Sequence, residues 1–121
     1  MSQVQTINHK GIEIIYTVFS GVKTEQEFYS VMELQAKEIR NRPLKSAYTL
    51  TNFENAFFNK NTASKISESL KMNAPHVKHS VLIGISGLLG VMVNGISKLS
   101  GRDLHVCNNF EEAKDYLASK A

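Results

Sequence analysis

The chain has 121 residues, of which 42% are hydrophobic and 21% charged, and its formal net charge is +3. These values exclude a disordered chain, a collagen-like fibre and a disulfide scaffold, and the length fits a single domain over residues 1–121. The only cysteine, Cys107, has no partner for an internal disulfide, and the first residues lack the pattern of a signal peptide. We therefore expect a cytoplasmic protein.

The first third of the chain predicts a hairpin followed by a helix. Residues 3–9 alternate in polarity, and residues 12–19 are rich in β-branched and aromatic side chains, with a turn between the two segments. A helix is then expected to open at Thr24, which forms a capping-box pattern with Glu27, and to close at Arg42.

Strands and helices alternate along the rest of the chain. We expect a strand over 46–51, a helix over 62–73, a strand over 80–85, a helix over 88–99, a strand over 104–107 and a final helix capped by Asn109. This alternation predicts an α/β sandwich with a mostly parallel sheet of about five strands, an antiparallel N-terminal edge strand and about four helices.

One uncharged segment, from Val81 to Ser97, calls for a membrane test. It is shorter than the roughly 20 apolar residues that a spanning helix needs, and its glycines divide it into a buried strand and a covering helix. We expect no membrane span. Basic residues are concentrated in residues 56–102, but arginine is scarce there, which favours solvated lysines over a nucleic-acid-binding face.

The sequence offers no complete catalytic or metal-binding pattern. Ser86 stands between a strand and a helix, as in a nucleophile elbow, but Leu88 occupies the position that requires glycine. His76 and His79 have no further metal ligands close to them in the sequence, and a zinc site needs three or four. We therefore expect a protein that is not an enzyme and that needs neither metal nor cofactor.

The segment from Val77 to Leu117 carries a resemblance to a known family. It runs VKHSVLIGISGL and, after an apolar stretch, VNGISKLSGRDLHVCNNFEEAKDYL. Together with the element order, this segment resembles the STAS-domain superfamily, in particular the divergent bacterial branch of small anti-sigma-factor antagonist-like proteins. The resemblance implies a STAS-like sandwich and a non-catalytic, regulatory role in which the domain binds a protein partner.

The resemblance also implies a phosphorylated Ser or Thr at the start of the helix after the third strand. The corresponding residues here are Asn61-Thr62-Ala63-Ser64, which differ from the usual Asp-Ser-small-Gly run. The hydroxyl-bearing residues of this segment, Thr62 and Ser64, are the candidate phosphoacceptors. A helix N-terminus suits a phosphate because its free N–H groups and its dipole favour negative charge. The alternative is that Asn61 or Thr62 only caps the helix.

Open parallel sheets bind their ligands beyond the carboxyl ends of the strands, which predicts a functional rim at that edge. The residues expected there are Phe57, Phe58, Thr62, Ser64, Ser86 and Gly87. The two phenylalanines are either a contact for a partner or a lipid, or a lid folded onto the core.

Two further expectations concern what the chain binds. A small apolar ligand or a lipid is the alternative to a protein partner, because the apolar helix over 88–99 and the Phe57-Phe58 loop together suggest an apolar pocket of several hundred Å³. A homodimer is expected if that helix exposes part of its apolar surface.

Overall fold

Among the described residues, five strands form one sheet whose order in space follows their order in the chain, β1-β2-β3-β4-β5. The computed structural model describes residues 3–85, residue 90 and residues 104–121. The strands are β1 (Val4–His9), β2 (Ile12–Val18), β3 (Ala47–Asn52), β4 (Val77–Ile83) and β5 (Leu104–Val106). β1 and β2 pair antiparallel and all other neighbours pair parallel, so the expected mostly parallel α/β sheet with an antiparallel N-terminal strand is confirmed.

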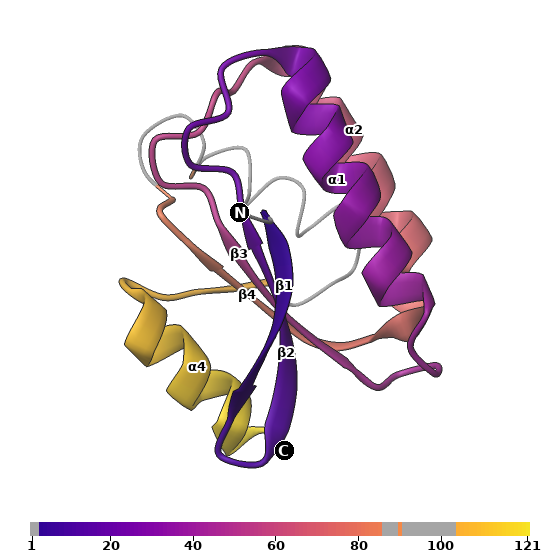
Figure 1. The fold of residues 1–121 in the computed structure, drawn as a ribbon, viewed down its shortest axis with the longest axis vertical. Coiled ribbons are helices and arrows are strands. Elements are labelled where there is room, and N and C mark those ends of the chain that lie inside the picture. Colours follow the sequence, from indigo (N-terminus) through magenta and orange to yellow (C-terminus); the bar gives the residue numbers. More distant parts are fainter. Residues whose placement is uncertain (1–2, 86–89, 91–103) are drawn as a thin grey trace.

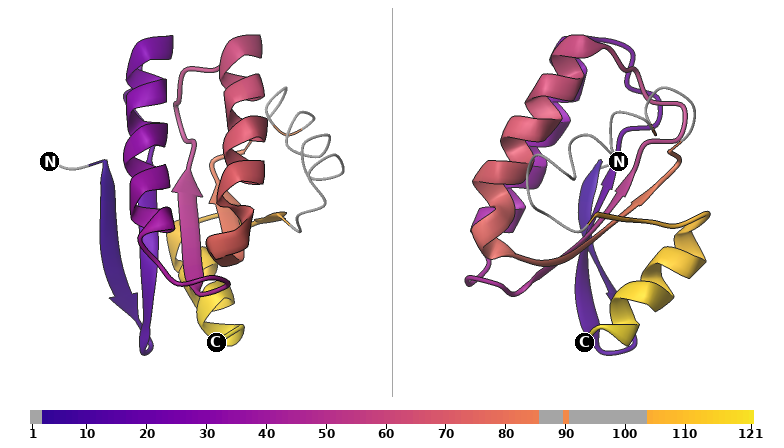
Figure 2. Two further views of the ribbon diagram at one scale, coloured as in Figure 1. Left: turned by 90° about the vertical axis from the view of Figure 1, so that its right-hand side faces the viewer. Right: turned by 180° about the vertical axis from the view of Figure 1, so that it is seen from behind.

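The helices cover both faces of this sheet (Figure 1). α1 (Glu25–Arg40) and α2 (Lys60–Asn73) lie side by side on one face, and α4 (Phe110–Ser119) lies on the other (Figure 2). A short 3-10 turn, η1 (Ala74–His76), leads from α2 into β4. The helix expected over 88–99 lies outside the described residues. None of the helices in the described ranges is both long and apolar enough to cross a membrane.

The alternation of side chains along the strands produces a separate hydrophobic core on each face. Three phenylalanine rings, Phe19, Phe28 and Phe53, stack within the first core cluster, between the sheet and α1 and α2. The second core cluster, under α4, contains Leu117, which is fully buried. Leu82 belongs to the first cluster and its neighbour Val81 to the second, as expected of a central strand that is covered on both faces.

The starts of two elements differ from the sequence prediction by two residues or more. α2 begins at Lys60 instead of residue 62 because the Asn59 side chain caps it. β4 begins at Val77 instead of residue 80 because Val77 pairs with Ala47 of β3. The register then shifts so that the next residue of β3, Tyr48, pairs with His79, and Lys78 forms a bulge between the two pairs.

Candidate functional site

The carboxyl ends of β2, β3 and β4 meet at one edge of the sheet, where polar groups bond to one another. The Ser20 hydroxyl donates to the Glu54 carbonyl oxygen at 2.6 Å, and the Glu54 amide donates to Asn52 Oδ1 at 2.9 Å. The Asn52 amide nitrogen in turn donates to the Tyr16 hydroxyl at 3.2 Å. Much of the hydrogen-bonding capacity expected at this rim is therefore used inside the protein.

Gly84 lets the loop after β3 pack directly against the end of β4. Its φ of +76° lies in the left-handed region, and a Cβ atom placed there would stand 2.3 Å from the Glu54 amide nitrogen. That distance is far below van der Waals contact, so a residue with a side chain does not fit unless the loop moves. The rim is thus fixed by a close backbone approach as well as by hydrogen bonds.

Phe57 and Phe58 are both partly buried and pack against the first core cluster. The Phe57 amide also donates to the Val22 carbonyl oxygen at 3.2 Å, which ties this loop to the segment before α1. The rings therefore lie as a lid on the core, the second of the two arrangements expected from the sequence.

Thr62 is fully buried, and its hydroxyl is engaged in the cap of α2. Thr62 Oγ1 accepts from the Asn59 amide at 2.9 Å and donates to the Asn59 carbonyl oxygen at 3.0 Å, while the Thr62 amide donates to Asn59 Oδ1 at 2.9 Å. The residue that caps the helix is therefore Asn59, and the prediction that Asn61 or Thr62 serves as the N-cap is wrong.

Ser64 lies on the same helix but is exposed. Its hydroxyl makes no hydrogen bond to another residue in the described part of the chain. Nearby, Glu25 Oε1 accepts from the side-chain amides of Asn59 at 2.6 Å and Asn61 at 2.8 Å, which joins the first turn of α1 to the start of α2. A carboxylate therefore already lies near the positive end of α2, where its charge is favourable.

The other residues singled out in the sequence do not converge on this rim. His76 Nδ1 donates to the Arg42 carbonyl oxygen at 2.8 Å, whereas the His79 ring stacks on Tyr48. Within the described ranges, no three His, Cys, Asp or Glu side chains gather as metal ligands. Ser86 and Gly87 lie outside the described residues.

Cys107 is buried under α4, and burial, followed by the charge of Glu112 and a hydrogen bond to it, raises the pKa of its thiol. Reactive cysteines are those with a lowered pKa, so this environment suits a packed thiol. His105 lies two residues before Cys107, in β5. Its ring stacks on the ring of Tyr116, with 3.8 Å between the ring centroids. Each of the two side chains is thus engaged with α4.

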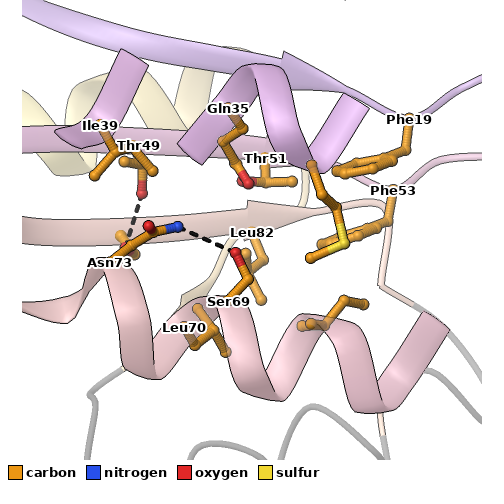
Figure 3. A pocket seen from close by; sticks show the side chains of 13 residues that line it. Phe19, Gln35, Ile39, Thr49, Thr51, Phe53, Ser69, Leu70, Asn73 and Leu82 are labelled. Carbon is orange, nitrogen blue, oxygen red and sulfur yellow. Dashed lines mark hydrogen bonds between the residues drawn. The ribbon is translucent and has the colours of Figure 1, made fainter. Parts of the chain in front are cut away.

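A small cavity lies between α1, α2 and the sheet (Figure 3). Gln35 of α1 donates to Thr51 Oγ1 of β3 at 3.0 Å, and Asn73 of α2 donates to Ser69 Oγ at 3.1 Å. Polar side chains thus reach the cavity from both helices and from the sheet, although most of the cavity wall is apolar.

The size of this cavity limits what it holds. Its volume is about 50 Å³, enough for a few water molecules, whereas pockets for small-molecule ligands usually measure roughly 300 Å³ or more. Thr49 Oγ1 and Ser80 Oγ, which lie 2.8 Å apart, form part of its wall. The cavity is therefore a small gap in the layer between helices and sheet, too small for a typical ligand.

Sequence reasoning missed this buried polar wall. Thr49 and Thr51 are two residues apart on one strand, so they face the same side of the sheet, and Ser80 is the partner of Thr49 in the register. The signal was the polar alternation within the strand expected over 46–51, but only the pairing of β3 with β4 brings the three hydroxyls together.

With the geometry in place, the chain was compared with known proteins. No family model matches it, and no curated protein matches it significantly. Within the described ranges, the features that bear on function are the exposed start of α2, the hydrogen-bonded rim beside it and the small cavity beneath the helices.

Proposed function

We propose that the protein is a non-catalytic regulatory module, STAS-like in fold, that binds a protein partner through the start of α2. The contact would be made by the α2 start surface, which we define as the exposed residues Lys60, Asn61, Ser64 and Lys65. The observation that carries this proposal is the contrast between the two hydroxyls at this place: Thr62 is sealed in the cap, whereas Ser64 is free at the surface.

The α2 start surface is held rigidly before any partner arrives. The Asn59 cap fixes the first turn of α2, and the Glu25 carboxylate links that turn to α1. A surface that is already ordered loses little conformational entropy on binding, so more of the contact energy is available for affinity. This rigidity supports recognition by a preformed surface.

Ser64 is the candidate phosphoacceptor in this proposal. A phosphate adds a charge of roughly −1.5 to −2 at neutral pH, and here it would lie in the N-terminal half of α2, between Lys60 and Lys65 in the sequence. Such a change would largely cancel the positive charge of Lys60 and Lys65 on the α2 start surface and switch the binding of a partner. Thr62 is a poorer acceptor because its hydroxyl is reached only after the helix start opens.

The element order supports the STAS-like fold. The described elements run β1-β2-α1-β3-α2-β4 and then β5-α4, the order on which the resemblance rests. The proposal adds a helix over 88–99 between β4 and β5 and treats the chain as a single cytoplasmic domain. The pocket expected for the alternative, a carrier for a lipid or a small apolar ligand, is bordered by residues 88–99, which apart from residue 90 lie outside the described residues, and the cavity of about 50 Å³ beneath α1 and α2 is a different one.

The test is capture of a partner from a native lysate by the purified protein and by two matched variants. Ser64→Glu adds a negative charge on α2, and Ser30→Glu adds the same charge at an exposed position on α1. We expect the wild-type protein and Ser30→Glu to capture the same partner, and Ser64→Glu to change its recovery by about tenfold or more, a difference of roughly 1.4 kcal/mol.

Two outcomes would overturn the proposal. Equal recovery of the partner with Ser64→Glu and with Ser30→Glu would remove the α2 start surface as the binding site. Intact-mass analysis of the purified protein that shows a bound small molecule, with no protein captured, would favour the ligand carrier instead.

A further inference from the structure

The outer edge of β1 lacks the features that usually prevent strand edges from pairing. β1 stands at one end of the sheet order, and Figure 2 shows it at the margin of the sheet. Its six residues, VQTINH, contain no proline and no charged side chain apart from His9 when protonated. Its register with β2 runs from Val4 to His9 without a bulge. Natural proteins usually protect an exposed edge with lysine, proline or a bulge.

The hydrogen-bonding groups of Thr6 and Asn8 point away from the sheet. The Val18 amide donates to the Gln3 carbonyl oxygen at 2.8 Å, so the backbone of Gln3 faces β2. Because residues of an antiparallel strand alternate in this respect, Gln5, Ile7 and His9 also face β2, and the residues between them face outward. Among the described elements, no strand lies beyond β1 to receive these groups.

We propose that this edge pairs with β1 of a second copy of the chain, antiparallel, about a two-fold axis at Ile7. In this register the backbone of Thr6 exchanges hydrogen bonds with Asn8 of the second copy, and Asn8 with Thr6, which uses the outward groups of both residues. Ile7 then lies opposite Ile7 of the second copy. Ile7 is already partly buried against the second core cluster, so the pairing extends that core across the axis.

The charges around β1 are compatible with a second copy as the occupant. In the proposed register, Gln5 faces His9 of the second copy, so no like charges oppose each other within the ladder. The charges that flank β1 are already neutralised within each chain: Lys10 lies 3.0 Å from Asp115, and Arg42 lies 2.6 Å from Glu13. Neither pair has to be broken when the two edges meet.

The arrangement also closes on itself. The same strand contributes from both copies, so the contact is isologous and ends at a dimer. At the opposite end of the described sheet, β5 has only three residues, which is too short an edge for comparable pairing. The area buried by two edges alone is small, so we expect a weak dimer that forms at high protein concentration. This surface shares no residue with the α2 start surface.

Disulfide crosslinking tests both the dimer and its register. In Ile7→Cys, the two new thiols would lie in a directly opposed pair about 4.5 Å apart between Cα atoms, within the range of a disulfide. In the matched control Gln5→Cys, each thiol lies opposite His9 of the second copy, so the two thiols are separated by roughly 14 Å along the strand. The wild-type chain, whose only cysteine is buried, controls for reaction at Cys107.

Under mild oxidation we expect Ile7→Cys to form a covalent dimer at least about tenfold faster than Gln5→Cys. Equal rates for the two variants would overturn the register. Circular dichroism of each reduced variant checks that the variant is folded before the two oxidation rates are compared. Gln5→Cys replaces an exposed side chain, so we expect it to fold like the wild type.

Analytical ultracentrifugation of the unmodified chain provides the second test. We expect the average mass to rise from 13.5 kDa toward twice that value as the concentration increases. Thr6→Pro removes an outward N–H and should abolish the rise, whereas Thr6→Val removes the hydroxyl that binds Arg42 but keeps the N–H and should retain it. A mass that stays at the monomer value up to the solubility limit would overturn the proposal.

Discussion

Single residues decide whether the rim at the carboxyl ends of the strands is open or closed. Gly84 admits the backbone of the loop after β3, and Thr62 turns its hydroxyl into the cap of α2. The two residues affect the candidate site in different ways. The glycine keeps the loop in place, and the buried threonine leaves Ser64 as the accessible hydroxyl of the pair.

The close approach at Gly84 predicts that its replacement by alanine is costly. Gly84→Ala should lower the free energy of unfolding by about 2–5 kcal/mol, because it combines a strained positive φ with a clash against the Glu54 amide. Gly21→Ala is the matched control, since Gly21 also has a positive φ but open space around it, and it should cost only about 1–2 kcal/mol. Urea denaturation measures both values, and equal losses would contradict the role of the close approach.

At the scale of elements, the strongest determinant of the candidate site is where α2 begins. Residues 62–73 show the apolar stripe of a helix, and the sequence places that stripe correctly: Ala63 and Ile66 are buried. The stripe does not reveal the cap, because Asn59 and Thr62 are both ordinary loop and cap residues. Because α2 starts at Lys60, Thr62 is part of the helix, and its position four residues before Ile66 places it on the buried face.

The cap gives a prediction for α2. Asn59→Ala should lower the free energy of unfolding by about 1 kcal/mol, within a range of roughly 0.5–2 kcal/mol, because Thr62 loses the acceptor for its amide. Asn61→Ala removes the other amide that binds Glu25 but leaves the cap intact, so its effect should be smaller. Thermal unfolding followed by circular dichroism compares them. An Asn61→Ala loss as large as that of Asn59→Ala would mean that the Glu25 contacts, and not the cap, stabilise the start of α2.

The sequence predicted the elements whose buried residues recur at a regular spacing. It did not predict features that depend on pairing with a segment far away in the chain. Phe28 and Val31 repeat at helical spacing and are buried in α1. The start of β4 was missed because Val77 becomes a strand residue only by pairing with Ala47, a contact between segments far apart in the chain. The polar wall of the cavity was missed for the same reason, since its hydroxyls meet only across paired strands.

At the scale of the whole molecule, the first hairpin is tied to the last helix. His9 Nε2 lies 2.8 Å from Asp115 Oδ1, and Lys10 Nζ lies 3.0 Å from the same oxygen. The hydrogen bonds from His9 and Lys10 lower the pKa of the Asp115 carboxyl below its ordinary value near 3.8. This contact joins elements from the two ends of the sequence across the face that α4 covers.

The tie predicts a pH-dependent effect of Asp115→Asn. A carboxyl whose pKa is lowered by folding stabilises the folded state above its unfolded pKa, and the contribution is lost as the pH falls through its folded pKa. Wild type should therefore melt at a higher temperature than Asp115→Asn at pH 6, and the difference should shrink as the pH falls below 3.8.

Glu38→Gln serves as the control for this experiment, because Glu38 is exposed on α1 and has no ion pair with another residue in the described ranges. Its substitution should leave the melting temperature nearly unchanged at both ends of the pH range. A difference between wild type and Asp115→Asn that stays constant from pH 6 to pH 3 would show that the ionised carboxylate contributes nothing to stability.

The order of the strands has a consequence for how the chain acquires its shape during synthesis. Each described strand after the first pairs with the strand that precedes it in the sequence. During synthesis, the pairing partner of a new strand has therefore already been made. No early strand has to wait for the far end of the polypeptide before it can pair. The sheet can therefore grow in one direction as the ribosome elongates the chain, with α4 sealing the second face last.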